Sequence, residues 1–227
     1  VSRSHGAIAV LLIFIVLTPT LLQGARSGND APMIVTSGVS ATDKVADWQE
    51  ALQWISQNLP PEAVVASWWD YGYWITVIAN RTSVADNATL NSTQIKILAE
   101  AMVSAEEISI ADFSKLRATH VVVFEIFDSN GYPAGGGDYS KSGWMISIAG
   151  FNSTEYFTTD QETGRRLPTE KAANSTIYKL LLSPYAQWEA GEDRQIVEKP
   201  TYFTKLFESS GKRVFVYSID YRKMVSS

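Results

Sequence analysis

Two short apolar runs, 63–67 (AVVAS) and 119–127 (THVVVFEIF), limit the folds open to this chain more than any other feature. Short runs rich in β-branched residues are typical of strands that are buried on both faces. A third run at 82–86 (TSVAD) and a fourth at 212–220 (KRVFVYSID) have a similar character. Because helical patterns separate these runs, we expect an α/β fold with a mixed, mainly parallel sheet, flanking helices and a less regular C-terminal part.

Helical spacing of apolar residues fills the intervals between the expected strands. Trp48, Leu52 and Ile55 follow i, i+4, i+7 spacing behind Thr42 or Asp43, either of which can cap a helix. A Pro-Pro pair at 60–61 ends this helix. Further helices are expected at 73–79, 92–102, 105–116, from 138, and at 169–183, with a loop at 187–193 (QWEAGED).

An uncharged apolar segment occupies residues 7–22, shortly after Arg3. It is slightly shorter than the about 20 apolar residues of a free-standing membrane span, and it also fits the core of a signal peptide. Both alternatives place the rest of the chain outside the cytoplasm, because the basic flank stays inside. We therefore expect a membrane-directed segment at 1–24, a linker at 25–42 and an extracytoplasmic globular domain at 43–227.

Composition argues against several classes of function. The net charge is −5 and no Lys/Arg run occurs, which speaks against nucleic-acid binding. The chain has no Cys, so disulfides, thiol catalysis and zinc–thiolate sites are excluded. With only two His, a His-based triad or a His-rich metal site is not expected either.

Asn-x-Thr sequons are frequent in this chain. Five of the eight Asn residues begin one, and none of the five has Ser at the third position. Such triplets also suit turns and helix caps, but their number favours an extracytoplasmic surface that carries glycans. The five candidate glycosylation sites are Asn80, Asn87, Asn91, Asn152 and Asn174.

The sequence WWDYG at 68–72 places aromatic rings around one carboxylate, directly behind an expected strand. Ligands of open α/β sheets bind beyond the carboxyl ends of strands. The indole N–H groups of Trp68 and Trp69 can only donate hydrogen bonds and the Asp70 carboxylate can only accept them, so together they match a bound hydroxyl group. The alternative is that the tryptophans pack in the core and Asp70 caps a helix. Gly72 is expected to permit a tight bend from strand to helix.

A second unusual stretch follows the 119–127 strand. Three glycines precede Asp138, and Asp138, Lys141 and Met145 fall on one face of the expected helix. The glycines allow the backbone to approach a neighbour closely, and a carboxylate at a helix N-terminus is favoured by the helix dipole. The alternative is an ordinary capped helix with a surface ion pair between Asp138 and Lys141.

Together these motifs resemble the catalytic subunit of oligosaccharyltransferase, the membrane enzyme that glycosylates Asn-x-Ser/Thr sequons. WWDYG at 68–72 is similar to the signature of that family. The sequence DYSKSGWMI at 138–146 resembles its second motif, Asp-x-x-Lys-x-x-x-Met, in the archaeal and eukaryotic members. The stretches 79–93 and 101–107 are similar to family sequence as well. The resemblance is most specific over 43–150 and weak towards the C-terminus.

The resemblance implies that 1–24 is the last of many membrane helices, which removes the signal-peptide alternative. It implies that Trp68, Trp69 and Asp70 bind the hydroxyl group at the +2 position of an acceptor sequon. Tyr71 and Gly72 complete the first motif. The helix with Asp138, Lys141 and Met145 is implied to lie beside this pocket, where Met145 contacts the +2 side chain and Lys141 bonds to it.

The resemblance also implies what lies outside this chain. The ligands of the family's Mn²⁺ or Mg²⁺ and the acidic residue that engages the acceptor amide lie mainly between earlier membrane helices, and the lipid-linked oligosaccharide binds the membrane part. We therefore expect acceptor recognition here, but no catalytic or metal-binding residue and no transfer by this chain alone. A membrane-anchored, glycosylated surface protein without catalysis is the alternative, and it leaves the two motifs unexplained.

Overall fold

The computed structural model of the protein describes residues 17–19, 22, 45–129, 133–159, 161–162, 166–182, 187–190 and 193–224. The chain divides into two units, Val1–Val45 and Ala46–Ser227. In the first unit, residues 17–19 and 22 are helical. The membrane helix predicted at 1–24 and the linker predicted at 25–42 lie almost entirely outside the described residues. None of the helices in the described part is long and apolar enough to cross a membrane.

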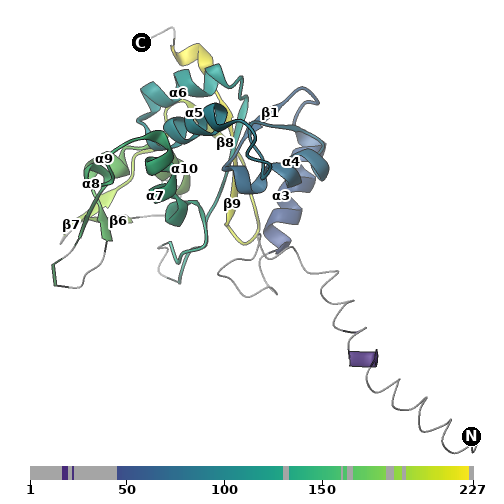
Figure 1. Ribbon diagram of the computed structural model, residues 1–227, viewed down its shortest axis with the longest axis horizontal. Coiled ribbons are helices and arrows are strands. Elements are labelled where there is room, and N and C mark those ends of the chain that lie inside the picture. The colour runs from purple at the N-terminus through teal and green to yellow at the C-terminus, as the bar shows by residue number, and fades with distance from the viewer. Residues whose placement is uncertain are drawn as a thin grey trace, which may run out of the picture. The chain divides into compact units, whose positions relative to one another are not determined.

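A five-stranded sheet forms the centre of the second unit, with the strand order β2-β1-β3-β9-β8 (Figure 1). β1 runs parallel to β2 and β3, whereas β9 runs antiparallel to both β3 and β8. The predicted mixed α/β fold is therefore confirmed, with its parallel strands on the β2-β1-β3 side. The strands are β1 (Val64–Ala66), β2 (Thr82–Ser83), β3 (His120–Phe124), β8 (Phe203–Glu208) and β9 (Val214–Ile219).

The register of β1 and β3 brings their carboxyl ends to the same edge of the sheet. Val65 pairs with His120, and Ala66 pairs with Val121. Every residue of β3 is buried, as expected for a strand covered on both faces. The segments that follow β1 and β3, which contain the two motifs, therefore leave the sheet side by side.

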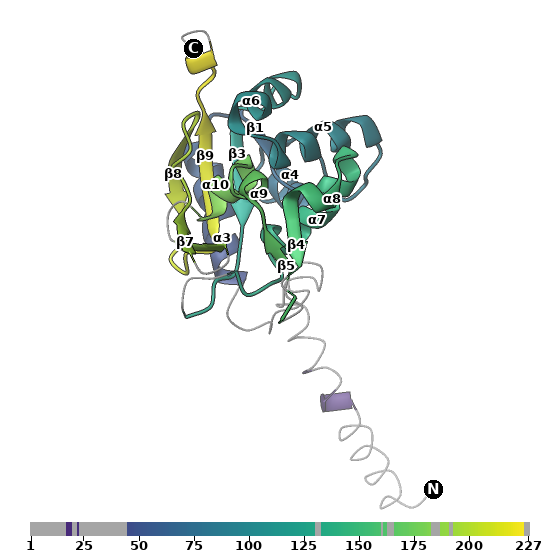
Figure 2. The ribbon, with the colours of Figure 1, turned by 90° about the vertical axis from the view of Figure 1, so that its left-hand side faces the viewer.

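Helices cover both faces of this sheet (Figures 1 and 2). α10 contacts β3 and packs with α5 and α7, whereas α3 lies across the other face, where Trp54 stacks on Phe207 of β8. The α3 residues with the predicted spacing, Trp48, Leu52 and Ile55, are at most 2% exposed. The helices are α3 (Val45–Asn58), α4 (Gly72–Val77), α5 (Ser92–Val103), α6 (Glu106–Lys115), α7 (Asp138–Ala149), α8 (Ser153–Tyr156), α9 (Glu170–Ala173) and α10 (Thr176–Leu182), with 3₁₀ turns η1 (Trp69–Tyr71) and η2 (Tyr221–Met224).

The helix predicted over 169–183 is in fact two helices, α9 and α10. Between them, Ser175 forms a β-bridge with Ala105. The backbone N–H of Thr176 donates to the carbonyl of Ser104 at 2.8 Å, and the Thr176 hydroxyl donates to the same carbonyl at 3.0 Å. These contacts with the start of α6 take the place of helical hydrogen bonds, so the helix breaks there.

The C-terminal part is more regular than predicted. The stretch 187–193, expected as a loop, contributes to a two-stranded sheet of β6 (Gln187–Ala190) and β7 (Asp193–Ile196). Another two-stranded sheet pairs β4 (Phe157–Thr159) with β5 (Arg166–Pro168). Residues after about 185 do not form a separate unit, because β8 and β9 extend the central sheet next to β3.

Candidate functional site

The WWDYG motif leaves the carboxyl end of β1 as the turn η1. The two tryptophan rings lie 6.1 Å apart, with Trp68 buried at 3% exposure and Trp69 half-buried. Neither indole N–H donates a hydrogen bond to another of the described residues. Both donors are therefore available to a ligand, although Trp68 presents little of its surface.

Tyr71 forms the buried floor of the motif. Its ring packs against Trp48 at a centroid distance of 4.5 Å, against Phe124 at 6.0 Å and against Trp74 at 6.1 Å. Its hydroxyl group donates to Oδ1 of Asp138 at 2.9 Å. The Tyr71 ring thus lies in a core layer, while its hydroxyl group contacts the second motif.

Gly72 is required for a reason other than the predicted one. Its φ of −58° is ordinary right-handed helix, so the backbone needs no special freedom there. A Cβ atom at this position would lie 2.1 Å from the carbonyl oxygen of Ala85. The prediction of a glycine-dependent bend was wrong, and close approach to the chain beyond β2 explains the residue.

The second motif begins α7 directly beside the first. Asp138 is 1% exposed, and its Oδ2 accepts the backbone N–H of Phe124 at 2.8 Å. One turn later, the Lys141 ammonium group donates to the Tyr71 hydroxyl at 2.8 Å and forms an ion pair with Asp70 at 2.6 Å. The ion pair of Lys141 is therefore with the first motif, and not the surface pair within α7 that the alternative described.

Exposure separates the motif residues into two groups. Trp69, Asp70 and Lys141 reach the surface, with side-chain exposures of 15% for Asp70 and 20% for Lys141. Tyr71, Gly72, Asp138 and Met145 are buried, and Met145 is 0% exposed. The partly exposed group offers contacts to a ligand, while the buried group holds these residues in place; a direct contact of Met145 with an acceptor stays a prediction.

Glu125, which the sequence analysis did not single out, connects the end of β3 to the start of α7. It is 0% exposed; its Oε1 accepts the N–H of Ile126 at 2.9 Å and its Oε2 accepts the N–H of Tyr139 at 2.7 Å. A Cβ atom on Gly137 would lie 2.5 Å from Oε1, so only glycine fits there. The one signal in the sequence was a carboxylate within an otherwise apolar run.

Burial dominates the electrostatics of this cluster. It raises the pKa of Glu125 to about 8, although two backbone N–H groups favour the charged form. It also raises the pKa of Asp138 to about 6, against the opposing influence of Lys141. Burial and the neighbouring Asp138 raise the pKa of Tyr71 well above its usual range. Within the described residues, no group of three or more His, Cys, Asp or Glu side chains is arranged to hold a metal ion.

Four of the five sequon Asn residues are exposed, and the two that cap helices are Asn91 and Asn152. Asn91 and Asn152 cap α5 and α8, each accepting a backbone N–H at its side-chain oxygen. Asn80 and Asn174 are also exposed, and Asn87 is half-buried. In the sequon of Asn174, however, the Thr176 hydroxyl is fully buried.

Comparisons with known proteins agree with one another. A family model described as the STT3/PglB/AglB core domain matches residues 61–129. The STT3 subunit of the dolichyl-diphosphooligosaccharide–protein glycosyltransferase of Dictyostelium discoideum is 32% identical over 161 residues, which is 70% of this chain and 22% of that protein. This chain spans between 22% and 30% of the length of the curated relatives that it matches.

Solved structures share the fold. The C-terminal globular domain of an oligosaccharyltransferase from Archaeoglobus fulgidus superposes with a TM-score of 0.53 at 22% identity, over 77% of this chain and 97% of that one. A second oligosaccharyltransferase from the same organism, tethered by a disulfide bond to an acceptor peptide with an NVT sequon, superposes with a TM-score of 0.50 at 18% identity, over 92% of this chain and 28% of that one.

Proposed function

This chain belongs to the family of oligosaccharyltransferase catalytic subunits, and we propose that its globular domain binds the Ser or Thr at the +2 position of acceptor Asn-x-Ser/Thr sequons. The observation that carries the proposal is the 2.6 Å contact between Asp70 and Lys141. It joins two motifs that are about seventy residues apart in the chain at one partly exposed spot. The alternative, a surface protein without catalysis, leaves the joining of these two motifs unexplained.

The hydrogen-bonding capacity left in this pair matches one hydroxyl group. The Lys141 ammonium group uses two of its three N–H donors, on Asp70 Oδ2 and on the Tyr71 hydroxyl. Its third donor can bond to the oxygen of an acceptor hydroxyl group, whose proton can then be donated to Asp70 Oδ1. A ligand hydroxyl group can therefore bond to both Lys141 and Asp70 without breaking the ion pair between them.

Trp69 adds a preference for Thr over Ser. Trp69 is half-buried and directly precedes Asp70 in the chain, so we propose that its ring covers the methyl group of a bound threonine side chain. Complete burial of one methyl group stabilises a complex by about 0.8 kcal/mol, or roughly fourfold in affinity. The acceptor peptide tethered by a disulfide bond to the Archaeoglobus fulgidus enzyme contains an NVT sequon, which has Thr at +2.

In the complete protein we propose transfer of an oligosaccharide from a lipid carrier to the Asn of the sequon, at a membrane and on its extracytoplasmic side. The implied Mn²⁺ or Mg²⁺ does not fit the described residues, among which no three or more His, Cys, Asp or Glu side chains are placed together to hold a metal ion. We place the metal site and the binding of the lipid-linked oligosaccharide outside the described part of this chain, and derive no step through the metal.

Replacement of Asp70 tests this function in the complete enzyme. We expect Asp70→Ala to lower kcat/KM for an Asn-x-Thr peptide by about tenfold to a hundredfold, because a hydrogen bond to a charged group contributes about 1.5–3 kcal/mol. Glu107→Ala, at an exposed position of α6, is the matched control and should leave transfer unchanged. Circular dichroism should show that both variants are folded. Wild-type transfer by the folded Asp70→Ala variant would refute the proposed role.

A further inference from the structure

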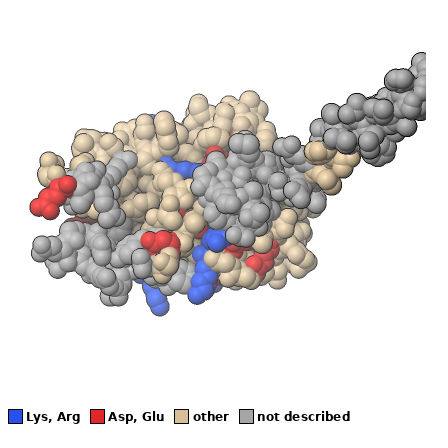
Figure 3. All heavy atoms as spheres, turned by 90° about the horizontal axis from the view of Figure 1, so that it is seen from below, with Lys and Arg blue, Asp and Glu red and all other residues tan. Residues whose placement is uncertain are grey.

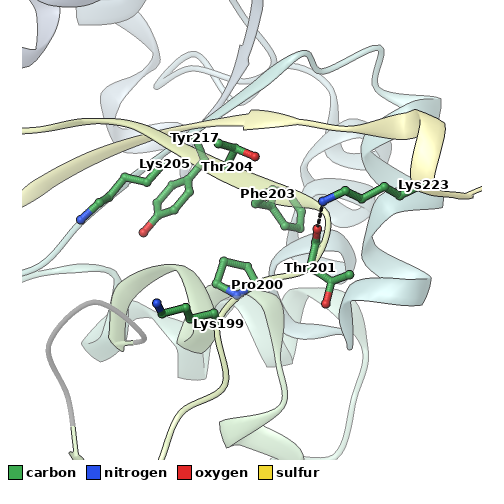
Figure 4. Close-up of a pocket in the computed structure, with 8 residues that line it drawn as sticks. All are labelled: Lys199, Pro200, Thr201, Phe203, Thr204, Lys205, Tyr217 and Lys223. Carbon is green, nitrogen blue, oxygen red and sulfur yellow. Dashed lines mark hydrogen bonds between the residues drawn. The ribbon is translucent and has the colours of Figure 1, made fainter.

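A pocket of about 480 Å³ lies at the end of the sheet opposite to the two motifs. Phe203 at the start of β8 pairs with Ile219, and Ser218 pairs with His120 at the beginning of β3. The two motifs follow the carboxyl ends of β1 and β3, so this pocket is a separate place in the domain. It is lined by Lys199, Pro200, Thr201, Phe203, Thr204, Lys205, Tyr217 and Lys223 (Figure 4).

The charged residues lining the pocket are all lysines. This contrasts with the net charge of −5 and with the described part of the face in Figure 3, where acidic and basic side chains lie near one another. Lys205 forms an ion pair with Glu208 at 2.5 Å. Lys223 donates to the carbonyl of Thr201 at 2.6 Å, and neither Lys223 nor Lys199 forms an ion pair with a carboxylate of the described residues. Two of the three positive charges are therefore not balanced by direct contact.

The wall of the pocket is held in place from behind. Glu106 is 1% exposed and accepts the backbone N–H groups of Thr201 at 2.7 Å and Tyr202 at 3.1 Å. Lys179 neutralises this carboxylate at 3.2 Å. On the other side, the Tyr217 hydroxyl donates to the carbonyl of Leu180 at 2.6 Å. The backbone that carries the lysines is thus fixed before any ligand arrives, which lowers the entropy cost of binding.

Figure 4 shows how the side chains are arranged around this wall. Lys199 and Lys205 point to the same side, with the Tyr217 ring between them, while Lys223 lies at the other end next to Thr201. Pro200 and Phe203 form the apolar surface between the two ends. A small anion would therefore bind between Lys199 and Lys205, where it competes with Glu208 for the second ammonium group.

We propose that this pocket binds a phosphate group, carried either by a soluble ligand or by a lipid headgroup. The ammonium group of Lys is a compact point charge that binds phosphate without the fixed geometry that Arg requires. A phosphate monoester carries a charge of about −1.5 to −2 near neutral pH, which suits a position between the Lys199 and Lys205 ammonium groups, where Glu208 is the competing carboxylate.

The experiment follows backbone amide chemical shifts of residues 201–205 in the whole chain. One series adds inorganic phosphate or diphosphate at constant ionic strength, and another adds phosphatidylcholine vesicles with or without phosphatidic acid. We expect saturable shifts, with diphosphate binding more tightly than phosphate. Saturation by the free anions identifies a soluble ligand, and saturation only by the phosphatidic acid vesicles identifies a headgroup; both support the proposal.

Variants separate this pocket from nonspecific charge attraction. Lys199→Ala should weaken binding about tenfold, because it removes one charge-assisted hydrogen bond. Glu208→Gln should tighten binding, because it removes a carboxylate that competes with the anion for the Lys205 ammonium group. Lys96→Ala, an exposed lysine on α5, should leave the affinity unchanged.

Three results would overturn the proposal. The first is the absence of saturable shifts with every phosphate probe. The second is equal weakening by Lys96→Ala and Lys199→Ala. The third is saturation by a poly-glutamate peptide when neither phosphate nor vesicles bind, which would make the pocket a carboxylate site. None of these bears on sequon binding, because the two motifs lie at the other end of the sheet.

Discussion

Glu125→Gln tests how the buried cluster positions the second motif, through the pH dependence of stability. Burial raises the pKa of Glu125 from its usual 4.5 to about 8. Between these values the native protein holds a proton that the unfolded chain has released. The free energy of unfolding therefore falls by about 1.4 kcal/mol for each unit of rising pH. Over the whole interval the loss is about 5 kcal/mol.

Asp138 adds a contribution of the same sign at lower pH. Its pKa rises from 3.8 in the unfolded chain to about 6 in the folded protein. The stabilisation from its protonation is therefore complete below about pH 3.8 and is lost as the pH rises to about 6. Above about pH 6, Glu125 is therefore the main source of the slope from this cluster. That interval is where the variant is informative.

Glutamine is neutral throughout, so Glu125→Gln should remove the slope between about pH 6 and about pH 8. The substitution also has a cost, because the amide NH₂ faces one of two backbone N–H donors, from Ile126 or Tyr139, and leaves it unpaired. That costs about 1–3 kcal/mol. At acid pH the variant should thus be less stable than wild type by about 1–3 kcal/mol. Above about pH 8 it should be more stable than wild type by about 2–4 kcal/mol, because only the wild type has lost about 5 kcal/mol.

Urea denaturation of the whole chain at a series of pH values, at constant ionic strength, measures both curves. Glu107→Gln, which removes an exposed carboxylate from α6, should follow the wild-type curve. Parallel curves for wild type and Glu125→Gln would refute the reasoning, because they would show that Glu125 gains no protons on folding.

Three further predictions concern the same domain. Tyr71→Phe keeps the ring but removes the donor to Asp138, so the free energy of unfolding in urea should fall by about 1–3 kcal/mol. Gly137→Ala forces a methyl group against the Glu125 carboxylate; we expect a lower melting temperature by calorimetry and weaker acceptor binding, and unchanged values would mean that α7 is not held there. When the folded chain is offered to an active oligosaccharyltransferase, mass spectrometry should find Asn152 modified and Asn174 bare, because the Thr hydroxyl of the latter sequon is buried; equal occupancy would contradict this.

The buried elements were predictable because their patterns are local. The apolar runs at 63–67 and 119–127 became β1 and β3, and the spacing of apolar residues located α3, α5 and α6. β8 was missed because it is an edge strand, where exposed polar residues such as Thr204 and Lys205 interrupt the apolar pattern. The break between α9 and α10 depends on contacts with residues 104–105, which no local pattern contains.

The motif residues could be named from the sequence, but their hydrogen-bond and ion-pair partners could not. The chemistry of WWDYG and the spacing of Asp138 and Lys141 marked these residues as unusual, and the family resemblance implied that they form one site. Their positions after β1 and β3 explain why they meet. The partner of Lys141 is Asp70, 71 positions earlier in the chain, and the partner of Asp138 is Tyr71. Such long-range contacts follow from the strand register, which no local sequence pattern reveals. Glu125 was overlooked for the same reason, because its contact with Tyr139 joins the end of β3 to the start of α7.

The central claim is that Asp70 and Lys141 together recognise the acceptor hydroxyl group. The most direct test compares two acceptor peptides in the complete enzyme, one with Thr at +2 and one with 2-aminobutyrate, which keeps the methyl group and lacks the hydroxyl. The wild-type enzyme should prefer Thr in kcat/KM by at least about tenfold, and Asp70→Ala should reduce this ratio to near one by slowing only the Thr peptide. An unchanged ratio in the folded variant would show that Asp70 does not contact the hydroxyl group.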